Sequence, residues 1–354
     1  MKLSEGNYKR IVIKIGSSLF YTKKGLDIFP LFEIVSHISS LIKLEGKEII
    51  IVSSGAIALG MNLLDLKSRP QELPYLQAAA AIGQNALMDN YSRLFRKYKI
   101  NCAQVLLTWD DFSDRKRYLN AKNTLLTLLK LGTVAIINEN DTVSTDEIKF
   151  GDNDRLSALV SSLISADLLV ILSDVDGLLD KDKNVIRVVD EITPQIKALA
   201  CPTNKKACVG GMITKIEAAK IAVDSGIPCV IANGRCKNIT ISAIKTPSLA
   251  GTLFVPKKSL AARERWIAFG TKPKGKITVD DGAKNALINK KSLLSVGIVA
   301  GNGIFEPGDI VSVIDRKNYE FARGKVNLSS RQIDKIKGSR YDKEVIHRDN
   351  IVIL

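Results

Sequence analysis

Apolar and polar positions in residues 1–253 follow two different periods. Short runs rich in β-branched residues predict buried strands, and longer runs with an apolar residue at every third or fourth position predict helices. The predicted strands are residues 10–15, 48–52, 102–107, 134–137, 168–172 and 229–232, and the predicted helices are residues 28–44, 56–64, 78–98, 119–131, 156–164 and 212–224. Strands that alternate with helices indicate a mostly parallel sheet with helices on both faces, which is a three-layer α/β/α sandwich.

The pattern changes near Leu253. Short strands with turn residues between them follow, and this pattern is typical of a small β-rich domain. The expected strands are residues 277–279, 310–314 and 321–326, and the expected turns are residues 301–303 and 307–309. We therefore predict an α/β domain at residues 1–260, a basic linker at 261–275 and a β-rich domain at 276–354.

The composition, with 45% hydrophobic and 25% charged residues, is that of an ordinary globular protein. No run of residues approaches the roughly 18 apolar positions that a membrane span needs, so no membrane contact is expected. The five cysteines form an odd number without a CxxC pair, and no apolar signal segment precedes them. We therefore expect reduced thiols in a cytoplasmic protein. They are Cys102, Cys201, Cys208, Cys229 and Cys236.

The net charge of +15 is unevenly distributed along the chain. Residues 255–354 hold 20 lysines and arginines against 11 aspartates and glutamates, so the smaller part carries the larger excess of positive charge. Such an excess favours anionic partners such as nucleotides or RNA. A lysine-rich surface without any such partner would give the same count.

Polar loops follow the predicted strands at residues 14–16, 53–55, 138–141 and 173–177. The carboxyl ends of parallel strands share one edge of the sheet, where ligands bind in such folds, so we treat these loops as one site. The stretch 149–155 adds Asp152, Asn153 and Asp154 immediately before a helix. These side chains either cap the helix or belong to the site.

The chemistry that remains open to this site is that of lysine, carboxylate and glycine-rich backbone. The sequence lacks a GxxxxGK[ST] loop, a GxGxxG motif and an HExxH motif, and its two histidines are far apart, at positions 37 and 347. Lysines, carboxylates and free amides are what phosphoryl transfer requires, because that reaction depends on positioning and charge neutralisation. The sequence therefore favours phosphoryl transfer over nucleophilic hydrolysis or zinc chemistry.

Two lysines and one aspartate are the candidate catalytic residues. Lys14 lies inside a buried strand and either extends to the strand end or faces a phosphate, for which the amides of Gly16 and Ser17 would form a cradle. Lys215 lies in the first turn of a helix, where its charge opposes the helix dipole unless an anion binds there. Asp154 between them would hold both lysines in place and keep both protonated.

A second group of residues suits an amino acid. Ser54, Asp141 and Asn153 offer a hydroxyl, a carboxylate and a carboxamide, which match an ammonium and a carboxylate group. Ser173 and Asp174 at a later strand end could meet the nucleotide. Each also has a plainer explanation as a helix cap, an Asx turn or a reverse turn.

Six stretches, taken in this order, resemble the amino acid kinase superfamily, and within it the members that phosphorylate glutamate. They are residues 14–18 (KIGSS), 52–56 (VSSGA), 138–141 (NEND), 151–154 (GDND), 173–178 (SDVDGL) and 210–215 (GGMITK). Residues 276–283 (KITVDDGA), 308–309 (GD) and 322–327 (ARGKVN) resemble the PUA domain that is often appended to such enzymes.

The resemblance implies an amino acid kinase fold and transfer of the γ-phosphoryl group of ATP to the side-chain carboxylate of L-glutamate, the first step of proline synthesis. It also implies Mg²⁺, feedback inhibition by proline, a homo-oligomer and RNA contact through the PUA domain. By the same resemblance, Lys14, Asp154 and Lys215 are catalytic, and Ser54, Asp141 and Asn153 bind glutamate. The implied ATP-binding residues are Lys14, Gly16, Ser173, Asp174, Gly210, Gly211, Met212, Ile213, Thr214 and Lys215.

One stretch departs from the family pattern, which has glycine and threonine where this chain has Cys208 and Val209. Two other functions stay open. One is another kinase of the superfamily, acting on N-acetylglutamate, aspartate, carbamate or a nucleotide, although the PUA-like tail argues against it. The other is an RNA-binding protein with a vestigial kinase half, although the presence of both lysines and Asp154 argues against that.

Overall fold

A computed structural model of the chain describes residues 7–22, 25–143, 152–200, 211–256 and 260–354. The chain divides into two compact units. The first comprises Met1–Asp111 and Lys116–Ser259, and the second comprises Phe112–Arg115 and Leu260–Leu354. None of the described helices has the length and apolar character needed to cross a membrane.

The first unit is built on one eight-stranded sheet, whose strand order is β5-β6-β4-β1-β7-β9-β10-β8. All neighbouring strands are parallel except β9 and β10, which confirms the expected mostly parallel sheet. The strands are β1 (Arg10–Ile15), β4 (Glu48–Ser53), β5 (Cys102–Leu107), β6 (Val134–Glu139), β7 (Leu168–Ser173), β8 (Val188–Val189), β9 (Cys229–Asn233) and β10 (Gly251–Phe254). A short ribbon of β2 (Tyr21–Thr22) and β3 (Gly25–Leu26) lies outside this sheet.

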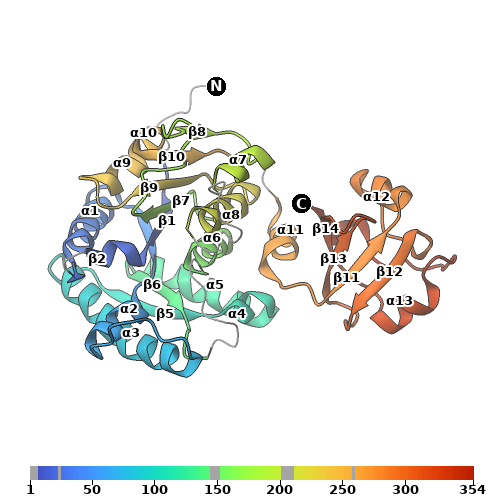
Figure 1. The fold of residues 1–354 in the computed structure, drawn as a ribbon, viewed down its shortest axis with the longest axis horizontal. Coiled ribbons are helices and arrows are strands. Elements are labelled where there is room, and N and C mark those ends of the chain that lie inside the picture. Colours follow the sequence, from blue (N-terminus) through green and yellow to red (C-terminus); the bar gives the residue numbers. More distant parts are fainter. Residues whose placement is uncertain (1–6, 23–24, 144–151, 201–210, 257–259) are drawn as a thin grey trace. The chain divides into compact units, whose positions relative to one another are not determined.

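Helices cover both faces of the sheet, as a three-layer sandwich requires (Figure 1). One face packs against α1 (Phe29–Glu45), α3 (Leu73–Arg96) and α9 (Ile239–Lys245), and the other carries α6 (Asp152–Ile164) and α8 (Met212–Asp224). The remaining helices are α2 (Ala56–Leu63), α4 (Trp109–Ser113), α5 (Arg115–Lys130), α7 (Pro194–Leu199) and α10 (Pro247–Ala250).

The alternation of side chains along β1 decides where its lysine points. Ile11, Ile13 and Ile15 lie in the core that β1 shares with α1. Successive side chains of a strand point to opposite faces, so Lys14 points to the face that carries α6 and α8.

Helix ends follow local rules that the sequence displays. Gly46 caps α1 with a left-handed φ of 61°, which glycine adopts without steric penalty. Helix α3 begins at Leu73, earlier than the expected residue 78, because Pro74 is well tolerated in a first helical turn.

The second unit has its own five-stranded sheet, with strand order β12-β11-β13-β14-β15, in which only β11 and β13 are parallel. Its core includes Ile277, Val279, Val311 and Val313. The strands are β11 (Gly275–Val279), β12 (Ile298–Gly303), β13 (Ile310–Ile314), β14 (Glu320–Lys325) and β15 (Ile351–Ile353), and the helices are α12 (Asp281–Ile288) and α13 (Ser330–Ile336).

One expectation about this unit was wrong. Residues 301–303 were expected to form a turn, but they belong to β12 and pair with β11. Gly303 has a φ of 97°, and a Cβ atom on it would lie 2.7 Å from the carbonyl oxygen of Lys274, so glycine serves close strand approach here. The stretch 261–275, which the sequence predicts to be a linker, contains α11 (Ala262–Arg265) and a π-helical turn, η2 (Trp266–Gly270).

We predict that Gly83→Ala destabilises the first unit by about 1–3 kcal/mol or more, because overpacking a close contact forces backbone shifts. A Cβ atom at Gly83 of α3 would lie 1.8 Å from the carbonyl oxygen of Ala56 in α2. The measurement is the free energy of unfolding in denaturant. The control is Gly282→Ala in α12, where the added Cβ would meet only Asp280 at 3.4 Å. That variant is expected to be neutral or up to about 1 kcal/mol more stable. Equal effects of the two substitutions would contradict the close-packing explanation.

Candidate active site

Three charged side chains meet at the carboxyl edge of the parallel sheet. Lys14 Nζ lies 2.6 Å from Asp154 Oδ1, and Lys215 Nζ lies 3.2 Å from Asp154 Oδ2. The three residues are buried, with exposed fractions of 4% for Lys14, 0% for Asp154 and 9% for Lys215. The structure therefore brings together all three candidate catalytic residues, which are up to 201 positions apart in the sequence.

Helix starts position two members of this triad. Asp154 lies in the first turn of α6, where the helix dipole favours a negative charge. Lys215 lies in the first turn of α8, where the dipole opposes its charge. Its Nζ atom also donates to the carbonyl oxygen of Gly211 at 3.3 Å, and Thr214 donates its hydroxyl to Asp154 Oδ2 at 2.8 Å. Asp154 thus supplies the negative charge that the start of α8 requires.

Burial and charge act in opposite directions on the pKa values of Lys14 and Asp154. Burial acts to raise the pKa of Asp154, but Lys14, Lys215 and the Thr214 hydrogen bond outweigh it, so that its pKa is lowered and the carboxylate is ionised at neutral pH. Burial lowers the pKa of Lys14, and the attraction of Asp154 only partly opposes this shift. Asp154 therefore favours the protonated form of Lys14, whereas burial of the ammonium, which is the larger effect, lowers its pKa.

The residues expected to bind an amino acid are partly assembled. Asn153 Nδ2 donates to Ser54 Oγ at 3.0 Å and to Asn138 Oδ1 at 2.9 Å. Asn153 Oδ1 is buried and has no hydrogen-bond partner among the described residues. Asp141 is half-buried and lies two residues beyond the end of β6, on the same edge of the sheet. Ser54 and Asn153 therefore form one polar cluster, and Asp141 follows the strand that supplies Asn138.

The residues expected to bind ATP flank the triad. Ser173, at the end of β7, is buried, and its hydroxyl has no partner within the described parts of the chain. Asp174 is exposed and close enough to Lys14 to raise its pKa. Gly211 precedes α8, and residues 212–215 form its first turn. Gly210, Cys208 and Val209 lie outside the described residues.

The expected role of Gly16 needs correction. Its amide donates to the carbonyl oxygen of Leu172 at 2.9 Å, so this N–H group is not available to cradle a phosphate. A Cβ atom on Gly16 would lie 3.5 Å from Lys14 Nζ and 3.2 Å from that carbonyl oxygen. Glycine at this position therefore leaves space beside the lysine.

Sequence reasoning missed the residues that support this cluster from α3. Gln84 accepts a hydrogen bond from Asn138, and Tyr91 donates to Ser53 Oγ at 2.8 Å. Gln84, Leu87 and Tyr91 follow helical spacing on one face of α3, and all three are buried. A glutamine at a core position of an apolar stripe was the available signal.

Metal ligands are sparse in this region. The described residues contain no group of three or more histidine, cysteine, aspartate or glutamate side chains that could hold a metal ion. Asp154 is already engaged by two lysines and a threonine.

Comparisons with known proteins agree with this geometry. Residues 9–233 match the model of the Amino acid kinase family, and residues 275–347 match the model of the PUA domain. The chain is 46% identical over 365 aligned positions to "Glutamate 5-kinase" of Thermoanaerobacter sp. (strain X514), with 98% of each chain covered. It is 47% identical to the protein of the same name from Caldanaerobacter subterraneus subsp. tengcongensis, with the same coverage.

A solved structure shows the same fold at low identity. The structure titled "Carbamate kinase from Giardia lamblia bound to AMP-PNP" has a TM-score of 0.51 and 17% identity, and covers 71% of this chain and 99% of its own. The two family models together span most of the chain, and both glutamate 5-kinases match it almost from end to end. The chain belongs to the amino acid kinase family, in its glutamate 5-kinase branch, and its second unit is a PUA domain.

Proposed function

We propose that this chain transfers the γ-phosphoryl group of ATP to the side-chain carboxylate of L-glutamate, giving γ-glutamyl phosphate and ADP. The observation that carries the proposal is the buried triad of Lys14, Asp154 and Lys215 at the ligand-binding edge of the sheet. The names of the relatives supply the substrate.

In the proposed reaction, a carboxylate oxygen of glutamate attacks the γ-phosphorus atom, and the bond to the bridging oxygen breaks, so that ADP leaves with the electron pair. A glutamate side chain has an ordinary pKa of about 4.3, so it is already ionised and needs no general base. Lys14 and Lys215 would stabilise the charge on the transferring oxygens. Asp154 would keep the two ammonium groups apart from each other and fixed in direction.

Nucleotide and metal complete the proposal. Ser173, Asp174 and the start of α8 would contact ATP, and Gly210 would extend this contact. Mg²⁺ usually keeps several waters and binds through substrate phosphates with one or two carboxylates, which fits the sparse metal ligands among the described residues. When bound, it would neutralise phosphate charge.

The glutamate site and the surface suggest regulation and assembly. Ser54, Asp141 and Asn153 would bind the ammonium and α-carboxylate of glutamate. Proline carries the same two groups, so it would compete there as a feedback inhibitor.

Leu63 of α2 and Tyr75 of α3 are each 60% exposed, and such apolar residues favour contact between copies of the chain in a homo-oligomer.

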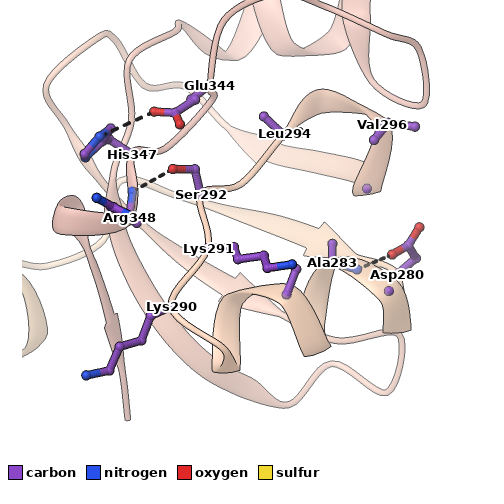
Figure 2. Close-up of a pocket in the computed structure, with 13 residues that line it drawn as sticks. Asp280, Ala283, Lys290, Lys291, Ser292, Leu294, Val296, Glu344, His347 and Arg348 are labelled. Carbon is purple, nitrogen blue, oxygen red and sulfur yellow. Dashed lines mark hydrogen bonds and ion pairs between the residues drawn. The ribbon is translucent and has the colours of Figure 1, made fainter.

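A second function, RNA contact, is supported by a cavity of about 760 Å³ in the PUA domain. Lys290 and Lys291 follow α12, while His347 and Arg348 come from the C-terminal stretch (Figure 2). Leu294 and Val296, with exposed fractions of 48% and 55%, add apolar surface. Cationic groups beside apolar surface suit the phosphates and unstacked bases of RNA loops.

The proposed kinase activity can be tested through its product. With glutamate, ATP, Mg²⁺ and hydroxylamine, the purified protein is expected to form γ-glutamyl hydroxamate. Asp154→Asn is expected to lower kcat at least about 100-fold, because the lysines lose the charge that positions them. Asp224→Asn is the control, since it removes an ion pair of 2.6 Å to Lys220 on the half-exposed face of α8. That variant should keep the wild-type kcat.

Two results would contradict the proposal. A folded wild-type protein that forms no hydroxamate excludes the activity. Equal kcat values in both variants, with the native circular dichroism spectrum retained, would exclude the role of Asp154.

The lowered pKa of Lys14 predicts how kcat/KM for ATP depends on pH. The lowered pKa of Lys14 means that the free enzyme loses this positive charge below the ordinary lysine value of 10.5. The ammonium form exists below the folded-state pKa, so kcat/KM for ATP is expected to be retained there and to fall as the pH rises through it. In Lys14→Arg, where guanidinium stays charged, this alkaline decrease should disappear although the rate is lower. Persistence of the same decrease in Lys14→Arg would show that another group causes it.

The proposed RNA contact predicts a role for two lysines of the PUA domain in RNA affinity. The double variant Lys290→Ala/Lys291→Ala is expected to bind a hairpin RNA more weakly and with a smaller salt dependence, by about 0.7 in slope for each lost phosphate contact. The control, Lys335→Ala/Lys337→Ala, removes the same charge from two exposed positions, one in α13 and one at its C-cap. Gel-shift titrations at several salt concentrations measure both quantities. Equal losses in the two double variants would indicate binding through net charge alone.

A further inference from the structure

A chain of side-chain amides lies at the same edge of the sheet and links its two helical layers. Gln84 of α3 accepts from Asn138 Nδ2 of β6 at 2.8 Å, and Asn138 Oδ1 accepts from Asn153 Nδ2 of α6 at 2.9 Å. Gln84 is 9% exposed and Asn138 is 2% exposed. The hydrogen bond between Gln84 and Asn138 is therefore shielded from water, whereas Asn153 is half-buried. A buried polar group that loses its partner is costly.

One backbone N–H group determines which atom of each side-chain amide donates and which accepts. The amide N–H of Glu139 donates to Asn138 Oδ1 at 2.9 Å. A backbone N–H can only donate, so the oxygen of the Asn138 side chain must face it and the nitrogen must face Gln84. Gln84 must then present its own oxygen to that nitrogen.

The same constraint continues to the proposed substrate site. Because Asn138 Oδ1 can only accept, Asn153 must present Nδ2 to it, and this nitrogen also donates to Ser54 Oγ. Ser54 therefore accepts one hydrogen bond and keeps its own proton free to donate. Asn153 Oδ1 is left as a buried acceptor with no partner among the described residues.

We propose that Gln84 is a positioning residue for the amino acid substrate. By holding Asn138, it fixes the amide of Asn153, so that the proposed substrate site offers Asn153 Oδ1 as an acceptor for the substrate ammonium and the Ser54 hydroxyl as a donor to a carboxylate oxygen. This inference rests on the proposed function, because it concerns recognition of glutamate.

Loss of the Gln84 oxygen would disturb the orientation of Asn153, although the two residues do not contact each other through a hydrogen bond. The buried Nδ2 of Asn138 would lose its acceptor, and the Glu139 N–H prevents the Asn138 amide from turning over in place. Asn138 would then leave its position, and Asn153 would lose the partner that orients it. Lys14, Asp154 and Lys215 belong to a separate ionic cluster, so ATP binding should not change.

The test compares Gln84→Met with Gln84→Glu by steady-state kinetics. Methionine keeps the side-chain size but removes the acceptor, and KM for glutamate is expected to rise about 5- to 10-fold, with KM for ATP unchanged. A glutamate side chain retains an oxygen that accepts from Asn138 in either protonation state, so Gln84→Glu should stay within about 3-fold of wild type. Leu87→Met, on the same buried face of α3, controls for altered packing and should not change KM.

A ligand comparison separates positioning from general damage. Calorimetric titration of the full chain with L-glutamate and with glutarate, which lacks the ammonium, needs no turnover. Gln84→Met is expected to weaken glutamate binding about 5- to 10-fold and glutarate binding by a smaller factor, because glutarate can lose only the carboxylate contact with Ser54.

Equal loss for both ligands, or an unchanged affinity for glutamate in Gln84→Met, would overturn the inference. A wild-type protein that binds glutamate without forming hydroxamate would overturn the proposed function and leave the positioning role to be judged by the titration alone.

Discussion

The structure depends on one buried carboxylate held between two buried lysines. Removing three charges from water is unfavourable unless they are paired, so Asp154 must meet Lys14 and Lys215 wherever the chain places them. This requirement brings a strand and two helix starts to one point. A parallel sheet satisfies it, because its strands and the helices that follow them present their ends at a common edge.

Adjacent residues at the start of α6 serve two different networks. Asp154 faces the lysines of β1 and α8, whereas Asn153 faces Ser54 after β4 and Asn138 of β6. Consecutive helical residues point about 100° apart, so one turn of helix can hold an ionic cluster and an amide cluster side by side. The proposed phosphoryl site and amino acid site thereby have a fixed spacing.

The PUA domain differs from the kinase unit in where its charged side chains lie. It has a separate hydrophobic core around Ile277, Val279, Val311 and Val313. Its cavity is lined by both cationic and acidic side chains outside that core, namely Lys290, Lys291 and Arg348 with Asp280 and Glu344. Positive charge outside a core is available to an anionic partner, whereas Lys14 and Lys215 of the kinase unit are paired with a buried carboxylate. The excess of positive charge in residues 255–354 is therefore compatible with a binding role.

The sequence by itself determined most strands and helices of the kinase unit, because the period of apolar residues and the glycine and proline signals act locally. Lys14 inside a β-branched run also marked the site, since a buried charge requires a partner. Only the tertiary structure decided that the Gly16 amide is used within the fold, that residues 301–303 form a strand, and that Gln84 supports Asn153 through Asn138. Gln84 and Asn138 are 54 positions apart, and nothing in local spacing specifies which buried donor meets which acceptor.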